Sequence, residues 1–162
     1  MSFNPGSYTS ASVIWSYDNR TLTDASIIWN HSVRTLTQFK AQSAEDTTEQ
    51  STGSGSYVDF LTLTITAPPD KHVMGVLTMH VDIKVVDTNY GPATLGFSIE
   101  DDVQKEVQYN GTDYKRFFYT TVLSLRPGET VTVKIKARNA TNVSPANVYL
   151  TNQLISFVYV EV

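Results

Sequence analysis

The stretch RPGETVTVKIKA, from Arg126 to Ala137, decides the fold class of this chain of 162 residues. Its first four residues form a turn signal, because proline presets the backbone dihedral φ and glycine tolerates positive φ. From Val131 to Ala137, apolar and polar residues then alternate. A period of two is typical of a β-strand with one face buried and the other facing solvent. The stretch therefore predicts a strand that covers a core on one side.

Similar short runs, separated by turn signals, fill the chain from residue 57 to its end. We count eight or nine such runs and no convincing helix between residues 57 and 162. Asn110-Gly111 gives the strongest signal for a tight hairpin in this region. Regular turn spacing without intervening helices predicts an all-β fold, an antiparallel jelly-roll-type β-sandwich.

A different pattern precedes the sandwich, because one short phrase is written twice between Ala11 and Thr37. Its second copy begins at Ala25 and is displaced from the first by fourteen residues. Such a repeated unit generally cannot bury its apolar side chains alone. We therefore expect an assembly role for the large apolar residues of the two copies, which are Ile14, Trp15, Leu22, Ile28, Trp29 and Leu36.

The geometry of the repeat stays open. Fourteen residues are two heptads, so Trp15, Leu22, Trp29 and Leu36 would share one seam of a coiled coil. Fourteen is also an even number, so both copies would present the same face as strands. The interval of seven favours short helical or coiled-coil-like turns, which we place slightly ahead, whereas the β-branched pairs in the two copies favour the strand.

The composition divides the chain into three parts. Residues 1–40 hold an N-terminal arm and the two repeats, as an attachment, stalk or donor segment. Residues 41–56 end in Ser51-Thr52-Gly53-Ser54-Gly55-Ser56 and carry few apolar side chains, which is typical of a linker. Residues 57–162 form the expected β-sandwich head.

Two stretches resemble known families. The phrase Ala-x-x-Ile-Trp-x-Tyr-x-x-Arg-Thr-Leu-Thr, from Ala11 to Thr23, resembles short repeats in tail-fibre and other structural proteins of bacterial and archaeal viruses. The stretches Leu123–Lys134 and Leu154–Val158 resemble the C-terminal half of heads shaped like tumour necrosis factor or complement component C1q. The resemblances imply a subunit of a viral fibre or surface appendage, assembled as a trimer, on the virion surface or an extracellular appendage.

Charge and residue types exclude several functions. The net charge of −4 argues against a general electrostatic grip on nucleic acid, and no apolar run is long enough for membrane insertion. Without cysteine there is no thiolate metal site or nucleophile, and the common catalytic motifs are absent. His80 with Asp82, and the acidic run Glu100–Asp102, carry metal-ligand atoms, but solvent-facing strands and turns give the same pattern. We expect a protein that is not an enzyme and needs no cofactor or metal.

A ligand surface is predicted around the Asn110-Gly111 turn, where aromatic and amide side chains gather. Flat aromatic faces beside hydrogen-bonding groups suit a cell-surface glycan. The candidate ligand-binding residues are Tyr109, Asn110, Tyr114 and Tyr119. Strand alternation would send about half of the aromatic side chains into the core, and the rest could equally form a subunit interface.

Three functions therefore remain. The first is a fibre or appendage subunit that assembles with copies of itself and has a receptor-binding head. The second is an open filament in which the N-terminal segment donates a strand to the next subunit. The third is a carbohydrate-binding module.

Overall fold

The computed structural model describes residues 39–143 and 146–162, and the two repeats with their six assembly residues lie outside this range. Nine strands and one short 3-10 helix, η2, make up the described part. They are β1 (Lys40–Asp46), β2 (Gln50–Thr52), β3 (Val58–Thr66), β4 (Val73–Val85), η2 (Thr88–Tyr90), β5 (Ala93–Ile99), β6 (Asp102–Tyr109), β7 (Lys115–Leu125), β8 (Thr130–Asn139) and β9 (Val148–Glu161). None of the helices in these two ranges could span a membrane.

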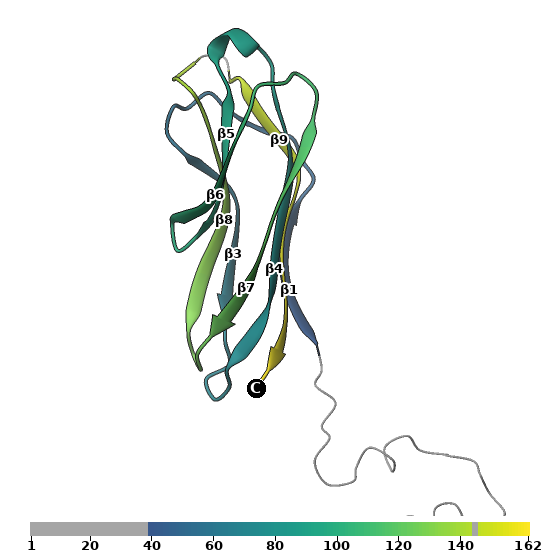
Figure 1. Cartoon of the computed structure of the whole chain (residues 1–162), viewed down its shortest axis with the longest axis vertical. Coiled ribbons are helices and arrows are strands. Elements are labelled where there is room, and N and C mark those ends of the chain that lie inside the picture. Colours follow the sequence, from purple (N-terminus) through teal and green to yellow (C-terminus); the bar gives the residue numbers. More distant parts are fainter. Residues whose placement is uncertain (1–38, 144–145) are drawn as a thin grey trace, which may run out of the picture. The chain divides into compact units, whose positions relative to one another are not determined.

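The strands form two antiparallel sheets that pack face to face (Figure 1). Sheet A has the order β1-β9-β4-β7, and β2 also pairs with β9. Sheet B has the order β3-β8-β5-β6. With β1 and β2 taken as one interrupted strand, each sheet has four strands, and the chain crosses between the sheets in the double Greek key of a jelly roll. The predicted all-β jelly-roll-type sandwich is confirmed.

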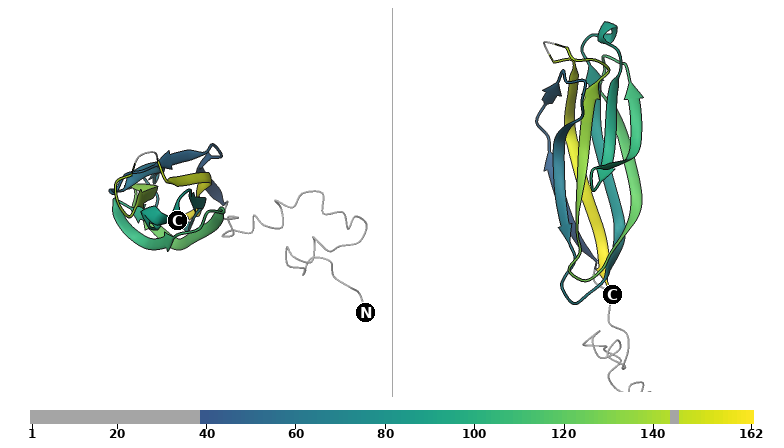
Figure 2. Two further views of the ribbon diagram at one scale, coloured as in Figure 1. Left: turned by 90° about the horizontal axis from the view of Figure 1, so that it is seen from above. Right: turned by 90° about the vertical axis from the view of Figure 1, so that its left-hand side faces the viewer.

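The core lies between the two sheets, which face each other in Figure 2, and is built from inward positions of β3 to β9. On β8, the alternation seen in the sequence places Val131, Val133, Ile135 and Ala137 inside. On β4 and β9, the same period buries Leu77, Met79, Ile155, Phe157 and others. Each large side chain that is fully buried stabilises the fold by about 1.5–3 kcal/mol. The sandwich therefore has a core of its own within residues 39–162.

The stretch 41–56 differs from the expected linker, because it holds β1 and β2. Both strands pair with β9, from Lys40 opposite Tyr159 to Thr52 opposite Val148. The glycines that follow are also held, because Val143 N donates a hydrogen bond to Gly53 O at 2.8 Å. This stretch is held mainly by backbone hydrogen bonds and makes few apolar contacts. Its polar composition therefore does not reveal the two strands.

The Asn110-Gly111 turn does not form the predicted hairpin. It connects β6, which pairs with β5 in sheet B, to β7, which pairs with β4 in sheet A. The tight hairpin lies instead between β5 and β6, where Glu100 and Asp101 both have positive φ, at 51° and 64°. A two-residue turn of this kind needs positive φ at both positions, which asparagine and glycine adopt more easily. The local signal for a hairpin was therefore overridden by the crossing between sheets.

Candidate assembly surface

The outer face of sheet B is polar throughout. Lys134 and Lys136 on β8 form ion pairs with Asp59 and Asp101, with nitrogen–oxygen distances of 2.7 to 3.7 Å. Tyr57 lies beside this cluster and donates a hydrogen bond to Glu106 at 2.7 Å. Burial, and then this bond to a carboxylate, raise the pKa of Tyr57 to about 12. Because its side chains are charged or carry hydroxyl groups, this face is well solvated.

The outer face of sheet A is different, because half of it is apolar. In one row across the sheet, Ala41 lies opposite Val158, Val158 opposite Val76, and Val76 opposite Val122. In the next row, Val160 lies opposite Met74. We call these side chains the apolar patch; its members are Ala41, Met74, Val76, Val122, Val158 and Val160.

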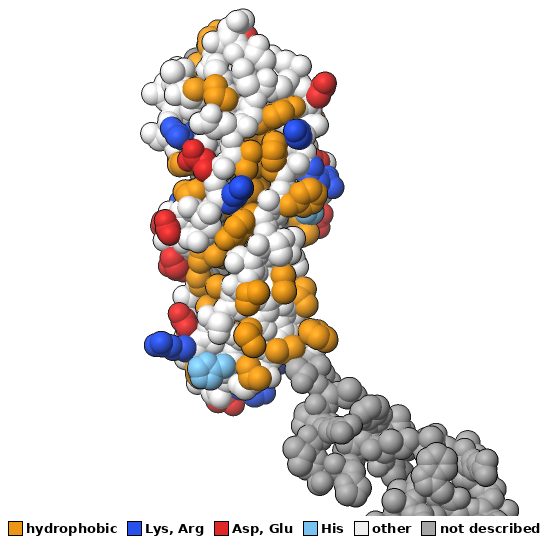
Figure 3. Space-filling view, viewed as in Figure 1, with side chains coloured by type: hydrophobic (Ala, Val, Ile, Leu, Met, Phe, Trp, Pro, Cys, Tyr) orange, Lys and Arg blue, Asp and Glu red, His pale blue; other side chains and the backbone are white. Residues whose placement is uncertain are grey.

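The patch is open to solvent within the described residues. The exposed fractions are 49% for Met74, 46% for Val76, 68% for Val122 and 43% for Val158. In the space-filling view, apolar side chains gather on the lower part of the sandwich, on the side of sheet A (Figure 3). Single exposed apolar residues are normal on a protein surface, whereas a contiguous group marks an interaction site.

A row of hydroxyl groups bounds the apolar patch. Ser43 lies opposite Ser156, Ser156 opposite Thr78, and Thr78 opposite Thr120. Because all four strands contribute, the row crosses the whole sheet. It divides the outer face of sheet A into the apolar patch and a second half, which we call the polar half although Leu154 and the exposed Phe118 lie in the row next to the hydroxyls.

The polar half is organised around Asp82 on β4. Arg116 on β7 donates two hydrogen bonds to the Asp82 carboxylate, from Nε and Nη2, both at 2.7 Å, and Asn152 donates a third at 2.9 Å. The bonds from Arg116, followed by the bond from Asn152, lower the pKa of Asp82 below its usual value. Asn152 has a positive φ of 48° and lies beside a bulge in the pairing of β4 with β9. The bulge thus brings a third donor to the carboxylate.

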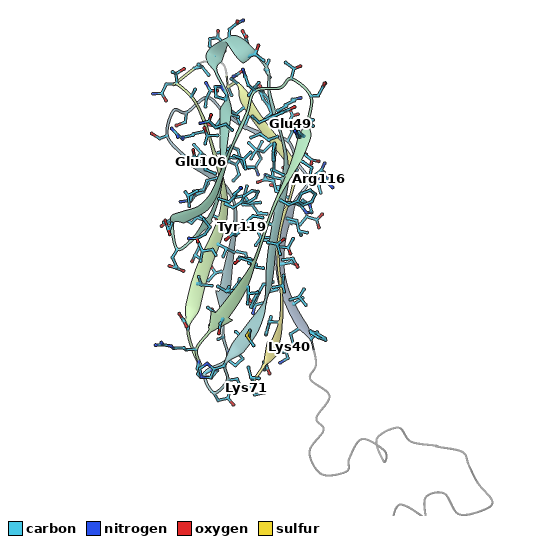
Figure 4. The ribbon with its side chains drawn as sticks, in the orientation of Figure 1. Lys40, Glu49, Lys71, Glu106, Arg116 and Tyr119 are labelled. Carbon is cyan, nitrogen blue, oxygen red and sulfur yellow. The ribbon has the colours of Figure 1, made fainter. Side chains whose placement is uncertain are left out.

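Two tyrosines and a lysine extend the polar half. Lys84 Nζ lies 4.4 Å from the centre of the Tyr114 ring, 5.5 Å from that of Tyr149, and 3.4 Å from Glu49 Oε2. Tyr114 donates a hydrogen bond to Glu49, and burial together with this bond raises the pKa of the Tyr114 hydroxyl. Glu49 and Arg116 both lie on the side of sheet A, whereas Glu106 lies on the side of sheet B (Figure 4).

The four candidate ligand-binding residues are not brought together on one surface. Tyr119 points into the sandwich and stacks on Phe97 at 6.0 Å between ring centres. Tyr109 is partly buried against the core and lies 5.7 Å from the ring of Phe117. Asn110 is exposed in the connection that follows β6, and Tyr114 belongs to the polar half of sheet A.

The groups that could have bound metal have protein partners. Asp82 is held by Arg116 and Asn152, and Asp101 by Lys134 and Lys136. Within residues 39–143 and 146–162, no three side chains of histidine, aspartate or glutamate come together as metal ligands would.

Sequence reasoning missed the apolar patch, although its signal was present. β9 carries apolar residues on both faces, with Ile155 and Phe157 inside and Val158 and Val160 outside. A strand that is apolar on both faces is expected to be covered on both. One edge of sheet A is also open, because β7 pairs only with β4 in the described part of the chain.

No protein-family model matches the chain, and neither does any curated protein sequence compared with it. Among solved structures, the chain is similar to the C-terminal domain of EclA, a sugar-binding protein, with 12% identity and a TM-score of 0.43 over 78% of this chain and 84% of that one. It is also similar to a chain of the IBDV viral particle, with 9% identity and a TM-score of 0.45, over 74% of this chain and 31% of that one. A Bacillus endospore appendage is similar with 15% identity and a TM-score of 0.36, over 81% of this chain and 97% of that one. Identity and TM-score are low in all three, so their roles are not transferred to this chain.

Proposed function

We propose that this protein is a structural subunit, without enzymatic activity, of a viral fibre or surface appendage, and that it assembles with copies of itself. The observation that carries the proposal is the apolar patch on sheet A. It is contiguous, spans all four strands of the sheet and contrasts with the charged outer face of sheet B. The N-terminal repeats, which resemble those of viral fibre proteins, support the same function.

The size of the patch decides what else the assembly needs. Four of its side chains are about half exposed, and covering them would contribute roughly half of 1.5–3 kcal/mol each, or about 3–6 kcal/mol together. Association costs about 4 kcal/mol or more in lost translational and rotational freedom. Two patches packed on each other would cover both sets of side chains and contribute about 6–12 kcal/mol, which lies within the range of about 4–15 kcal/mol that association costs, so they would bind weakly on their own. A stable assembly needs further apolar surface, and the repeats provide six large apolar residues.

In this proposal the partners are other copies of the chain, with a trimer as the closed form. The location that follows is a virion surface or an extracellular appendage. An open filament is the alternative arrangement. The edge of β7 favours it, because among the described residues this edge has no paired neighbour, and an added strand would find backbone groups to bind there. A cell-surface glycan is a further candidate partner of the head.

Carbohydrate binding is a second candidate function, and the polar half of sheet A favours it. Tyr114 and Tyr149 offer aromatic surface beside Lys84 and the pair of Asp82 with Arg116. Sugar sites combine flat apolar faces with fixed hydrogen-bonding groups in this way. Titration of the full chain with a panel of neutral glycans, compared with Tyr114→Ala, tests this function.

The test of self-assembly is the absolute mass of the full chain in solution, measured by light scattering over a range of concentrations. We expect an oligomer, and we expect Val122→Lys in the apolar patch to lower its mass toward that of a monomer. Thr64→Lys is the matched control, because Thr64 is an exposed strand residue on sheet B. A wild-type chain that is monomeric at every concentration would contradict the proposal.

A further inference from the structure

The apolar patch lies beside the point where the N-terminal segment joins the sandwich. β1 begins at Lys40, and its next residue, Ala41, is part of the patch. Phe39, just before β1, is 77% exposed. The 38 residues that precede Phe39 include both copies of the apolar phrase. An apolar surface that no described residue covers and a segment with large apolar side chains are thus joined in one chain.

We propose that residues 11–37 dock on the apolar patch of sheet A and cover it with the large side chains of the repeats. This contact would explain how the proposed assembly is held together. Where the docked segment comes from a neighbouring copy, the inference rests on the proposed function. The docking contact is then the contact that holds the assembly together.

The distances allow this contact. Strands in a sheet are about 4.8 Å apart, so β7 lies roughly 15 Å from β1 across sheet A. An extended chain spans about 3.3 Å per residue, so the ten residues from Trp29 to Phe39 reach about 33 Å. The second repeat can therefore reach every strand of the patch from its own chain. A tether of this length also keeps the local concentration high, on the order of millimolar.

The charges of the two surfaces agree with docking. Within residues 11–37, the acidic Asp18 and Asp24 are balanced by the basic Arg20 and Arg34. The apolar patch itself contains no charged side chain. Docking would therefore not bury an unpaired charge of the sandwich, which is among the largest penalties in association. The serines and threonines of the repeats also match the row of hydroxyls that bounds the patch.

The open edge of β7 offers a place for the segment beside the patch. β7 is eleven residues long, and Val122 faces outward near its middle. Long exposed edge strands readily pair with an added strand. The β-branched pairs of the repeats suit such a strand, and the even spacing of fourteen would let each copy present the same face.

Tryptophan fluorescence of the full chain tests the docking directly. Both tryptophans, Trp15 and Trp29, lie in residues 11–37, so their emission reports on this segment alone. We expect wild-type emission to lie to the blue of the urea-unfolded chain. Val122→Lys and Val158→Lys should each shift it to the red and increase quenching by acrylamide, whereas Thr64→Lys should not. Circular dichroism of each variant checks that the sandwich remains folded.

A second measurement maps the contact. Val122→p-benzoylphenylalanine in the full chain, after irradiation, should crosslink to peptides from residues 11–37, and the same substitution at Thr64 should not. Docking is overturned if wild-type emission already equals that of the unfolded chain. It is also overturned if the emission is blue-shifted but unaffected by both patch variants, since the tryptophans are then buried elsewhere.

The mass of the same samples separates this inference from the proposed function. A monomer whose emission responds to Val122→Lys would support docking within one chain and contradict the assembly function. An oligomer whose emission ignores both patch variants would support assembly and overturn docking, as expected if two patches cover each other.

Discussion

Val76 on β4 lies directly opposite Val122 on β7, and both side chains face outward from sheet A. Opposite residues on neighbouring strands have Cβ atoms about 4.5–5.5 Å apart, so the pair forms a small apolar surface without help from the core. Because the pair faces solvent, it adds little to the fold. Substitutions of Val76 or Val122 should therefore change association without much change in the stability of the fold.

The first prediction concerns Val122→Thr, which keeps the β-branched shape and removes apolar surface. The free energy of unfolding should change by no more than about 0.5 kcal/mol, as is usual for exposed positions. The mass of the assembly should nevertheless fall at low concentration. Chemical unfolding and light scattering on the same sample check both parts. A large loss of stability would show that Val122 serves the fold instead.

The second prediction concerns truncation. A chain that begins at Thr37 keeps β1 and β2 and should unfold in one cooperative transition. A chain that begins at Tyr57 lacks both strands, which leaves one edge of β9 unpaired, so it should unfold at a much lower temperature or not fold. Calorimetry of the two fragments distinguishes them. Equal midpoints would mean that β1 and β2 are dispensable.

The third prediction concerns pH and Asp101. Hydrogen bonds and charge attraction from Lys134 and Lys136 lower the pKa of Asp101 from 3.8 to about 2. A lowered pKa in the folded state gives stability that is present above about pH 4 and is lost as the pH falls toward 2. Asp101→Asn should therefore unfold at a lower temperature than wild type at pH 6.

Acid is the control for this third prediction. The difference in unfolding temperature between wild type and Asp101→Asn should shrink steadily from pH 4 to pH 2. Asparagine also tolerates the positive φ at this position, so backbone strain should not contribute. A difference that does not depend on pH would show that the ion pairs with the two lysines are not its cause.

The fourth prediction concerns Gly75 on β4. A Cβ atom added there would lie 2.2 Å from Val158 O and 2.6 Å from Tyr159 Cα, both in the backbone of β9. Since backbone atoms cannot turn away, Gly75→Ala should destabilise the fold by about 1–3 kcal/mol. Gly55→Ala is the control, because its nearest contact would be 3.2 Å. Equal losses for the two variants would contradict this explanation.

The sequence shows the fold class where side chains alternate clearly, as they do on β8. It does not show β1, because Gln42 and Asp46 occupy half-buried positions there and the pairing is made by the backbone. It also could not show where the Asn110-Gly111 connection leads, because a turn signal does not specify which sheet receives the next strand.

The candidate surface was hidden for a related reason. The repeats contain large apolar side chains that are expected to need a partner, and the sequence of β9 is apolar on both faces. Only the structure shows which face of β9 lies outside the sandwich. Tyr109 and Tyr119 illustrate the converse. Their aromatic side chains suggested a ligand surface, whereas strand parity and the position of the second sheet turn them toward the core.

The antiparallel pairing of Lys40 with Tyr159 puts the first and last strands of the jelly roll side by side at one end. Lys40 and Lys71 both hold Glu161 there, so this end is fastened by ion pairs as well as by the sheet. The loop that contains η2 lies at the opposite end (Figure 1). The sandwich therefore has two different ends: a peptide grafted into the η2 loop would be presented at the end opposite Lys40 and Glu161, and that loop could vary without disturbing these ion pairs.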